Sequence, residues 1–225
     1  TALNPRNLLA SPRFASTPFT LGVASGDPSA DGMVLWTRLA TEPLVFGGGM
    51  PARPMVVEWQ LAADEGMRKV VRQGSALAHP ELGHAVHVEL DGLAPGRPYW
   101  YRFTVGGHAS AVGGTRTLPS ATAAVDRVRF VVAGCQHYEE GHYTAWRRIA
   151  EEPLDFVFHY GDYIYEGESQ PGPRKMNGQP FTNLRNHVGP QIYTLDDYRR
   201  RYAQYKTDPD LQAAHAAAAF QIGSA

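Results

Sequence analysis

Two short apolar segments, each ending in a glycine, constrain the fold of this 225-residue chain more than any other feature. Residues 128–136 (VRFVVAGCQ) and 156–165 (FVFHYGDYIY) flank residues 144–152, where apolar side chains recur at helical spacing until Pro153. We therefore predict a strand, a helix and a second strand. Because such strands run parallel with a right-handed crossover, their carboxyl ends share one sheet edge. A ligand site is expected there.

The side chains that follow these two strands suit a metal ion. Cys135 offers a thiolate, Asp162 a carboxylate that can bridge two cations, and Tyr165 a phenol that a strongly Lewis-acidic ion can deprotonate. Sulfur ligands select transition metals, whereas carboxylate oxygen accepts almost any divalent ion. The combination favours iron over magnesium or calcium alone.

Each of these residues also has a structural explanation when taken alone. A cysteine after a buried strand is usually an inert core residue, and Gly-Asp after a strand is commonly a turn. The metal interpretation is preferred because the three side chains are expected at one edge. Three histidines are expected at the surface or in support of a ligand rather than as ligands themselves: His142, His159 and His187.

Several motifs resemble those of the alkaline phosphatase D (PhoD-like) family. Residues 161–165 (GDYIY) fit the GDxxY motif of metallophosphoesterases of the purple acid phosphatase type. Residues 19–28, 32–38 and 198–202 resemble the amino-terminal portion of the family, and the likeness covers nearly all of residues 18–217. It implies a secreted phosphatase or phosphodiesterase whose site holds iron (Fe3+) and calcium.

The resemblance also implies roles for individual residues. Cys135, Asp162 and Tyr165 would be iron ligands, with Asp162 shared with a neighbouring ion. The implied reaction is hydrolysis of a phosphate mono- or diester substrate by a metal-activated water. Asp162 and His137 are the residues expected to act in catalysis. His137 lies just past Cys135 at the same edge, where it would hold a phosphate oxygen or orient a ligand.

The sequence offers only two strand ends with ligands, whereas a two-metal hydrolase needs more, including histidines and an asparagine. In the family, the helix resembling residues 208–217 leads into a strand ending in Asp-Asp-His-Glu, but here residues 218–225 read AAFQIGSA. We expect an incomplete fragment with little activity of its own, and an unpaired sheet edge beside that helix. The alternative is a non-catalytic β-sandwich binding module with a vestigial α/β tail and no bound iron.

The predicted fold class is multi-domain β plus α/β. Short segments rich in β-branched and aromatic residues, separated by Gly, Pro and Asp turns, predict a β-sandwich. Residues 93–101 (LAPGRPYWY) resemble the corner of a fibronectin type III domain. The predicted divisions are an irregular arm (1–17), a fibronectin type III-like β-sandwich (18–118), a linker (119–126) and a partial PhoD-like metallophosphatase domain (127–225).

Some side chains have competing structural and functional explanations. Trp36, Trp59 and Trp100 are expected in the core rather than on a carbohydrate platform. The long loop 167–189 is expected to be functional or disordered, with its charges Arg174 and Lys175 in solvent rather than on phosphate. Thr194 to Asp197 has capping-box spacing, Asp208 is expected to cap a last helix, and four residues are expected on one packing face: Leu195, Tyr198, Tyr202 and Tyr205.

Composition excludes some functions. A formal net charge of -1 argues against stable nucleic-acid binding through phosphate contacts. No Gly-x-Gly-x-x-Gly follows the first strand, so a dinucleotide-binding unit is poorly supported. No apolar run approaches the ~20 residues of a membrane-spanning helix. The polar start at residues 1–12 is typical of a stretch after a removed leader, which favours an exported, periplasmic or extracellular protein.

Overall fold

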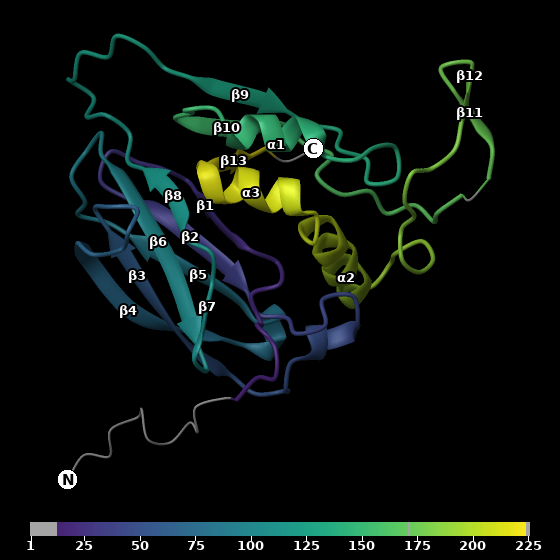
Figure 1. Cartoon of the computed structure of the whole chain (residues 1–225), viewed down its shortest axis with the longest axis horizontal. Helices are drawn as coiled ribbons and strands as arrows, with labels where there is room; N and C mark the ends of the chain where they lie inside the picture. Colours follow the sequence, from purple (N-terminus) through teal and green to yellow (C-terminus); the bar gives the residue numbers. More distant parts are fainter. Residues whose placement is uncertain (1–12, 171, 224–225) are drawn as a thin grey trace.

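The computed structural model describes residues 13–170 and 172–223, which form a β-rich molecule with some helices (Figure 1). Most of the predicted arm, residues 1–12, lies outside the described residues. The main sheet has six strands in spatial order: β5 (Ala85–Leu90), β2 (Met33–Arg38), β1 (Val23–Gly26), β13 (Phe220–Ile222), β10 (Phe156–His159) and β9 (Phe130–Ala133). The second sheet contains β4 (Val70–Ala78), β3 (Met55–Ala62), β6 (Pro98–Val105) and β7 (His108–Ala109), with β8 (Gly113–Arg116) paired to β6.

The remaining elements are helical turns, helices and one small hairpin. They are η2 (Phe46–Gly49), η3 (Pro80–Leu82), α1 (Thr144–Ala150), α2 (Leu195–Lys206), α3 (Pro209–Ala217), and the hairpin strands β11 (Arg174–Met176) and β12 (Gln179–Phe181). The hairpin lies within the predicted long loop and projects from the body of the molecule (Figure 1). Asn177 and Gly178 both take positive φ at its tip, as the Asn-Gly hairpin turn requires. No helix of the described residues is long and apolar enough to cross a membrane.

The amino-terminal part buries its core between the two sheets. In β6, alternate side chains point inward, so Tyr99, Tyr101 and Phe103 are buried as the aromatic pattern predicts. The three tryptophans expected in the core are only half-buried. Trp100 faces away from Tyr99 and Tyr101 because it lies between them on the same strand, whereas Trp36 and Trp59 lie at the margins of buried clusters.

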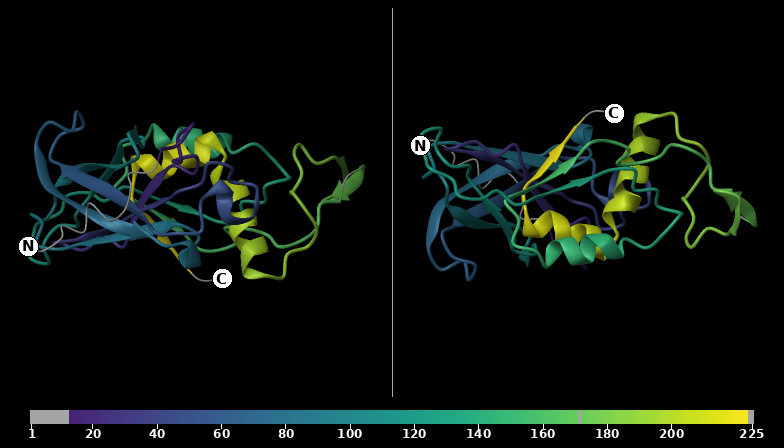
Figure 2. Two further views of the ribbon diagram at one scale, coloured as in Figure 1. Left: turned by 90° about the horizontal axis from the view of Figure 1, so that it is seen from below. Right: turned by 90° about the horizontal axis from the view of Figure 1, so that it is seen from above.

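The predicted strand, helix, strand unit is present, with β9 and β10 parallel. The helix between them ends at Ala150, and residues 151–152 form a turn instead of continuing it. Both α1 and α3 cover one face of the β9, β10 and β13 sheet (Figure 2). The opposite face exposes Phe130, Val132 and Phe158 among the described residues.

The expectation of a missing strand beside the last helix is wrong. Residues Phe220–Ile222 form β13, which pairs in parallel with β10 on one side and meets β1 at Gly26 on the other. A side chain at Gly26 would lie 2.8 Å from the carbonyl oxygen of Phe220, so glycine permits this close approach. The pairing joins the strands of both predicted domains into one sheet.

Helix α2 begins as predicted, because Thr194 and Asp197 form a capping box. Its predicted packing face is partly wrong, since Leu195 and Tyr198 are exposed while Tyr205 is fully buried. The buried face instead includes polar side chains, most notably Lys206. Asp208 accepts hydrogen bonds from the backbone N–H groups of residues 210 and 211 and so caps α3 as predicted.

Lys206 is fully buried, and its ammonium nitrogen has no hydrogen-bond partner among the described residues. It lies over the ring of Trp36, 5.2 Å from the centroid. Burial lowers the pKa of Lys206 from 10.5 to about 7. Between those two values the unfolded chain binds more protons than the folded chain, so the contribution of Lys206 to stability improves as pH rises.

We predict that Lys206→Met stabilises the fold by about 1–3 kcal/mol at pH 7, because it removes an unpartnered polar group from the interior. The gain should shrink by pH 10, where the wild-type amine is neutral in the folded chain. Urea denaturation at both pH values measures the difference. Lys175→Met, at an exposed hairpin position, is the control and should change stability little. A loss of stability at pH 7 would show that the contact with Trp36 outweighs the cost of burial.

Candidate metal centre

The two parallel strands end in matching turns. After β9 the chain reads Gly134-Cys135, and after β10 it reads Gly161-Asp162. Cys135 and Asp162 both take positive φ, 54° and 53°, a conformation uncommon for residues other than glycine. The turns bond to each other, because the Cys135 N–H donates to the Gly161 carbonyl oxygen at 3.2 Å. The two side chains are thereby brought together at the sheet edge.

Four side chains meet at this edge, and we refer to them as the Asp162 cluster: Cys135, Tyr160, Asp162 and Tyr165. The thiol of Cys135 donates to Asp162 Oδ2 at 3.3 Å, and the hydroxyl of Tyr165 donates to the same oxygen at 2.9 Å. The hydroxyl of Tyr160 lies 3.9 Å from Cys135 Sγ. Cys135 and Asp162 are exposed. The three predicted metal ligands therefore lie in mutual contact on an accessible surface.

Without a cation, the cluster favours protonated phenols. Burial and the hydrogen bond to Asp162 raise the pKa of Tyr165. The hydrogen bond to Cys135 raises the pKa of Tyr160. A bound cation is a large local charge that reverses this preference and favours the deprotonated ligands. Loading the cluster with metal would therefore release protons.

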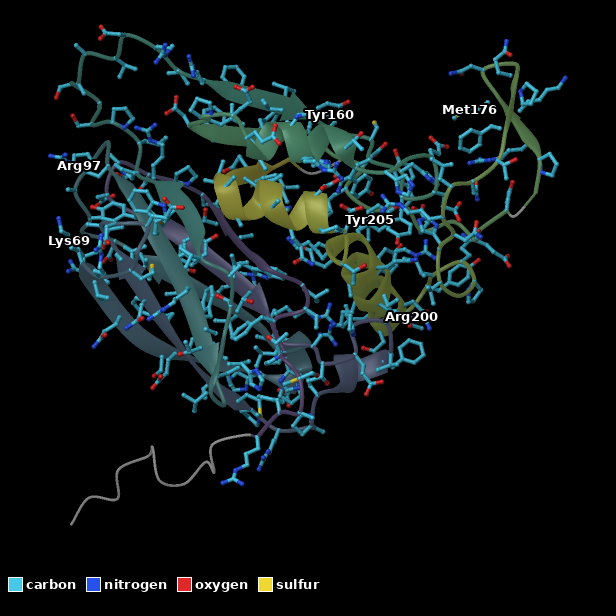
Figure 3. The ribbon with its side chains drawn as sticks, viewed as in Figure 1. Lys69, Arg97, Tyr160, Met176, Arg200 and Tyr205 are labelled. Carbon is cyan, nitrogen blue, oxygen red and sulfur yellow. The ribbon has the colours of Figure 1, made fainter. Side chains whose placement is uncertain are left out.

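Tyr160 was not among the residues selected from the sequence. It closes the gap between the two turns, and a side chain at Gly134 would meet its ring at 2.3 Å. Figure 3 shows Tyr160 near the end of the sheet, well separated from Met176 on the hairpin. The signal in the sequence is its place directly before Gly161, because a residue between a strand end and the following turn lies at the same edge of the sheet as that turn.

His137 lies beside the cluster, with its ring centroid 4.5 Å from that of Tyr165 and 5.4 Å from that of His187. His187 is buried and receives a hydrogen bond at Nδ1 from Arg201 at 3.1 Å. Burial, and then the charge of Arg201, lower the pKa of His187 to about 4. The ring that packs beside His137 is therefore the neutral imidazole of His187.

Arg201 connects this support to the cluster. Its guanidinium donates to the backbone carbonyls of Tyr165 at 2.5 Å and Gly167 at 3.0 Å. The side chain is buried, so α2 holds the loop after Asp162 from within the molecule. No distinct signal in the sequence indicates this role, because Arg201 is one arginine in a run of three at residues 199–201.

The structure does not bring the other predicted polar residues into the cluster. His142 is exposed. His159 is buried against Trp146, and both its ring nitrogens lack a partner among the described residues. Arg174 pairs with Glu140 at 3.4 Å and lies over the Phe181 ring, while Lys175 is exposed.

The donor set of the Asp162 cluster fits an iron ion in part. One thiolate, one carboxylate and one phenolate are ligands suited to a transition metal. The described residues contain no group of three His, Cys, Asp or Glu side chains that could hold a metal, so tyrosine is needed to complete three ligands. Calcium takes 6–8 oxygen ligands, and the described residues do not assemble such a set at Asp162.

Gln136 holds the two turns in place. Its Nε2 donates to the Tyr163 carbonyl oxygen at 2.9 Å, and its Oε1 accepts from Trp146 Nε1 at 2.9 Å. Its backbone carbonyl accepts from the hydroxyl of Tyr143 at 2.7 Å. Because Gln136 is buried, these bonds fix the loop after β9 to the loop after β10 and to α1.

The comparisons with known proteins agree with the motifs. The PhoD-like phosphatase N-terminal domain model matches residues 4–119, and the PhoD-like phosphatase model matches residues 130–223. Alkaline phosphatase D of Bacillus subtilis (strain 168) is 53% identical over 208 residues, which cover 92% of this chain and 35% of that protein. The solved structure of PhoD matches with a TM-score of 0.90 and 51% identity, covering 96% of this chain and 40% of that one. The chain thus spans well under half the length of these relatives.

Fibronectin type III domains match only weakly. That of the human collagen alpha-1(XX) chain has a TM-score of 0.29 and 19% identity, over 53% of this chain and 95% of that domain. A TM-score this low does not show a shared fold, so the fibronectin type III likeness of the sandwich stays a prediction.

We predict that Gln136→Leu destabilises the fold by about 2–4 kcal/mol, because it leaves Trp146 Nε1 and the Tyr163 carbonyl buried without partners. Urea denaturation measures the change. The control is Gln73→Leu, at an exposed position of β4, which should stay within about 0.5 kcal/mol of the wild type. Equal effects of the two substitutions would show that Gln136 does not hold the turns together.

Proposed function

We propose that this chain, which belongs to the PhoD-like phosphatase family, provides part of the metal centre of an enzyme that hydrolyses phosphate mono- or diesters. One observation carries the proposal: Cys135 and Tyr165 both donate hydrogen bonds to the same carboxylate oxygen, Asp162 Oδ2. This convergence occurs at the carboxyl ends of parallel strands, where α/β sheets bind ligands.

In this proposal Cys135, Asp162 and Tyr165 hold an iron ion. When bound, the ion would supply Lewis-acid activation of water and of phosphate oxygens. Tyr165 and Cys135 would bind the ion in their deprotonated forms. His137, beside Tyr165, holds a phosphate oxygen of the substrate. His187 stays neutral and positions the His137 ring, and Arg201 fixes His187 in turn.

From the family resemblance we also propose a calcium ion next to the iron ion, with Asp162 as a ligand of both. Its other oxygen ligands are not among those that the described residues bring to the cluster. Three protein ligands also leave an iron ion open to water and substrate. We therefore expect that iron binding by these three side chains can be measured in this chain without an activity assay.

The domain division and the location of the protein are further parts of the proposal. Residues 18–118 form a fibronectin type III-like sandwich, 119–126 a linker, and 127–225 part of the metallophosphatase domain. The division is supported by the absence of any described helix or strand between Arg116 and Phe130. The family resemblance supports an exported protein.

We predict that iron binds this chain and that Asp162→Ala removes most of it, because Asp162 contacts both other ligands. Elemental analysis after loading and buffer exchange measures the content. Tyr165→Phe should abolish the visible charge-transfer band expected of tyrosinate bound to ferric iron while leaving the fold intact. Tyr193→Phe, at an exposed position, is the matched control and should leave the band unchanged. Equal iron in the wild type and Asp162→Ala would show that Asp162 is not an iron ligand, and no iron in the wild type would favour the non-catalytic binding module.

We also predict slow hydrolysis of a chromogenic phosphomonoester or phosphodiester by the 225-residue chain at alkaline pH with added iron and calcium. Full rate enhancements of ~10⁶-fold or more require a positioned nucleophile and stabilisation of developing charge, and three ligands supply only part of this. The residual rate should be lost in Asp162→Ala. A rate that is indifferent to this substitution would exclude the Asp162 cluster as its source.

A further inference from the structure

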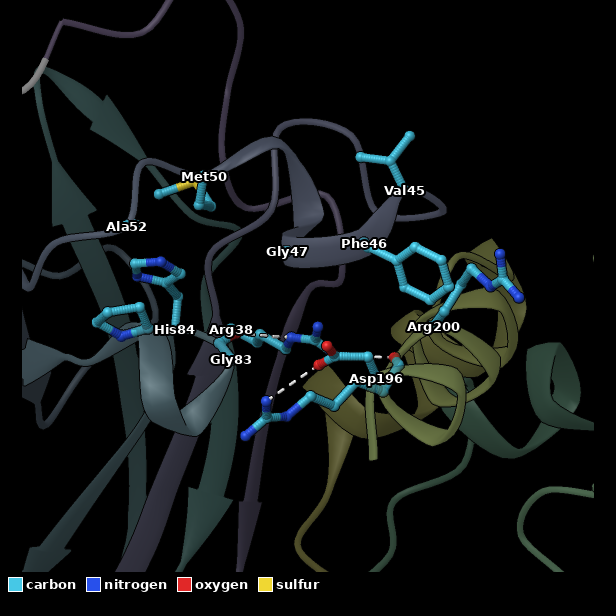
Figure 4. A pocket seen from close by; sticks show the side chains of 12 residues that line it. Arg38, Val45, Phe46, Gly47, Met50, Ala52, Gly83, His84, Asp196 and Arg200 are labelled. Carbon is cyan, nitrogen blue, oxygen red and sulfur yellow. Dashed lines mark hydrogen bonds and ion pairs between the residues drawn. The ribbon is translucent and has the colours of Figure 1, made fainter. Parts of the chain in front are cut away.

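A second site lies away from the Asp162 cluster, in a cavity of about 250 Å³ between the amino-terminal sheets and α2 (Figure 4). Its walls come from the end of β2, the η2 and η3 turns and the start of α2. None of its lining residues belongs to the Asp162 cluster. We call this cavity the α2 pocket.

The α2 pocket is lined by more positive than negative charge. Arg38, Arg199 and Arg200 line it together with Asp196, and Arg200 is also paired with Asp197 next to the pocket. His84 also lines it, but burial lowers the pKa of this histidine, so it contributes no charge at neutral pH. The net positive lining favours an anionic ligand over a neutral or cationic one.

Arg38 is the strongest indication of a missing anion. This side chain is only 7% exposed, and its guanidinium donates to two neutral carbonyl oxygens, those of Gly83 and Arg199, each at 2.9 Å. It forms no ion pair with any carboxylate of the described residues. Burial and the charge of Arg199 lower the pKa of Arg38. A buried cation without a counter-charge is costly, and an anion in the pocket would offset that cost.

The other two arginines differ in their carboxylate partners. Arg199 donates to Asp196 Oδ1 at 3.3 Å, and that carboxylate is largely exposed. Arg200 lies over the ring of Phe46, 4.5 Å from its centroid. Arg200 also pairs with Asp197 Oδ1 at 3.5 Å, and both of these side chains are largely buried, whereas Arg199 has no buried carboxylate partner.

One wall of the α2 pocket is apolar. Val45, Phe46 and Met50 line it beside the arginines (Figure 4). A cavity of about 150 Å³ is enough to hold benzene, so this larger pocket can hold a small organic group together with an oxyanion. Guanidinium groups bind phosphate through two parallel hydrogen bonds, which suits the neighbouring residues Arg38 and Arg199.

We propose that the α2 pocket binds a small organic phosphate, with the phosphate group at Arg38 and Arg199 and the organic group against Phe46 and Met50. The ligand would join the amino-terminal sheets to α2. This site is additional to the proposed metal centre and requires no metal.

The test is calorimetric titration of the 225-residue chain with phenylphosphonate and with inorganic phosphate. All proteins carry Asp162→Ala and contain no added metal, so that the Asp162 cluster does not contribute. Phenylphosphonate is chosen because its carbon to phosphorus bond resists phosphatase chemistry. We expect it to bind more tightly than inorganic phosphate, since only phenylphosphonate uses the apolar wall.

Three substitutions and one control separate the contributions. Arg199→Gln should weaken both ligands about tenfold, the loss expected for one charge-assisted hydrogen bond. Asp196→Asn should tighten both about threefold by removing a carboxylate that lines the pocket, a gain that misfolding cannot produce. Phe46→Ala should weaken phenylphosphonate alone. Glu151→Gln, which removes one exposed charge just after α1, is the control and should change neither.

The proposal is overturned by any of three results. The first is no binding of phenylphosphonate. The second is inorganic phosphate binding as tightly as phenylphosphonate, since the apolar wall would then have no role. The third is affinity that stays the same in both Arg199→Gln and Asp196→Asn, which would place the ligand elsewhere. Circular dichroism of each variant accompanies the titrations, and the gain in Asp196→Asn tests the site even if Arg199→Gln fails to fold.

Discussion

The candidate site depends on one interaction, the parallel pairing of β9 with β10. Four pairs of residues in register, from Phe130 with Phe156 to Ala133 with His159, bring the two strand ends to the same level. Beyond them, Cys135 and Asp162 adopt the left-handed conformation, and their turns bond to each other. The ligand side chains meet because β9 and β10 end at the same level of the sheet and the turns that follow them lie side by side.

The two turns at Cys135 and Asp162 combine strained backbone conformations with satisfied polar contacts. Left-handed residues other than glycine cost of order 1–3 kcal/mol each, and Gln136 holds both turns with bonds that would be lost if the turns relaxed. His187 and Arg201 form a second buried polar group behind His137. Such departures from local preference concentrate at functional sites, where surrounding structure compensates for them.

Helix α2 connects regions that the sequence separates. Arg201 holds the backbone after Asp162, while the carbonyl oxygen of Arg199 accepts a bond from Arg38 at the end of β2. Arginine can perform both tasks because its long stem carries five donors in a planar fork. The bond between Arg38 and Arg199, together with the meeting of β1 and β13 at Gly26, joins the two predicted domains.

The sequence by itself determined the local features of this protein: the alternating strand β6, the unit of β9, α1 and β10, the caps of α2 and α3, and the edge at which Cys135, Asp162 and Tyr165 meet. Periodicity, glycine turns and the handedness of parallel connections depend on residues close together in the chain, so they can be recognised in the sequence. Only the tertiary structure decided that residues 220–222 complete the sheet, that Tyr160 and Arg201 join the site, and that Lys206 rather than Leu195 is buried. These outcomes depend on contacts between residues far apart in the chain, where space and hydrogen-bond partners override the local pattern.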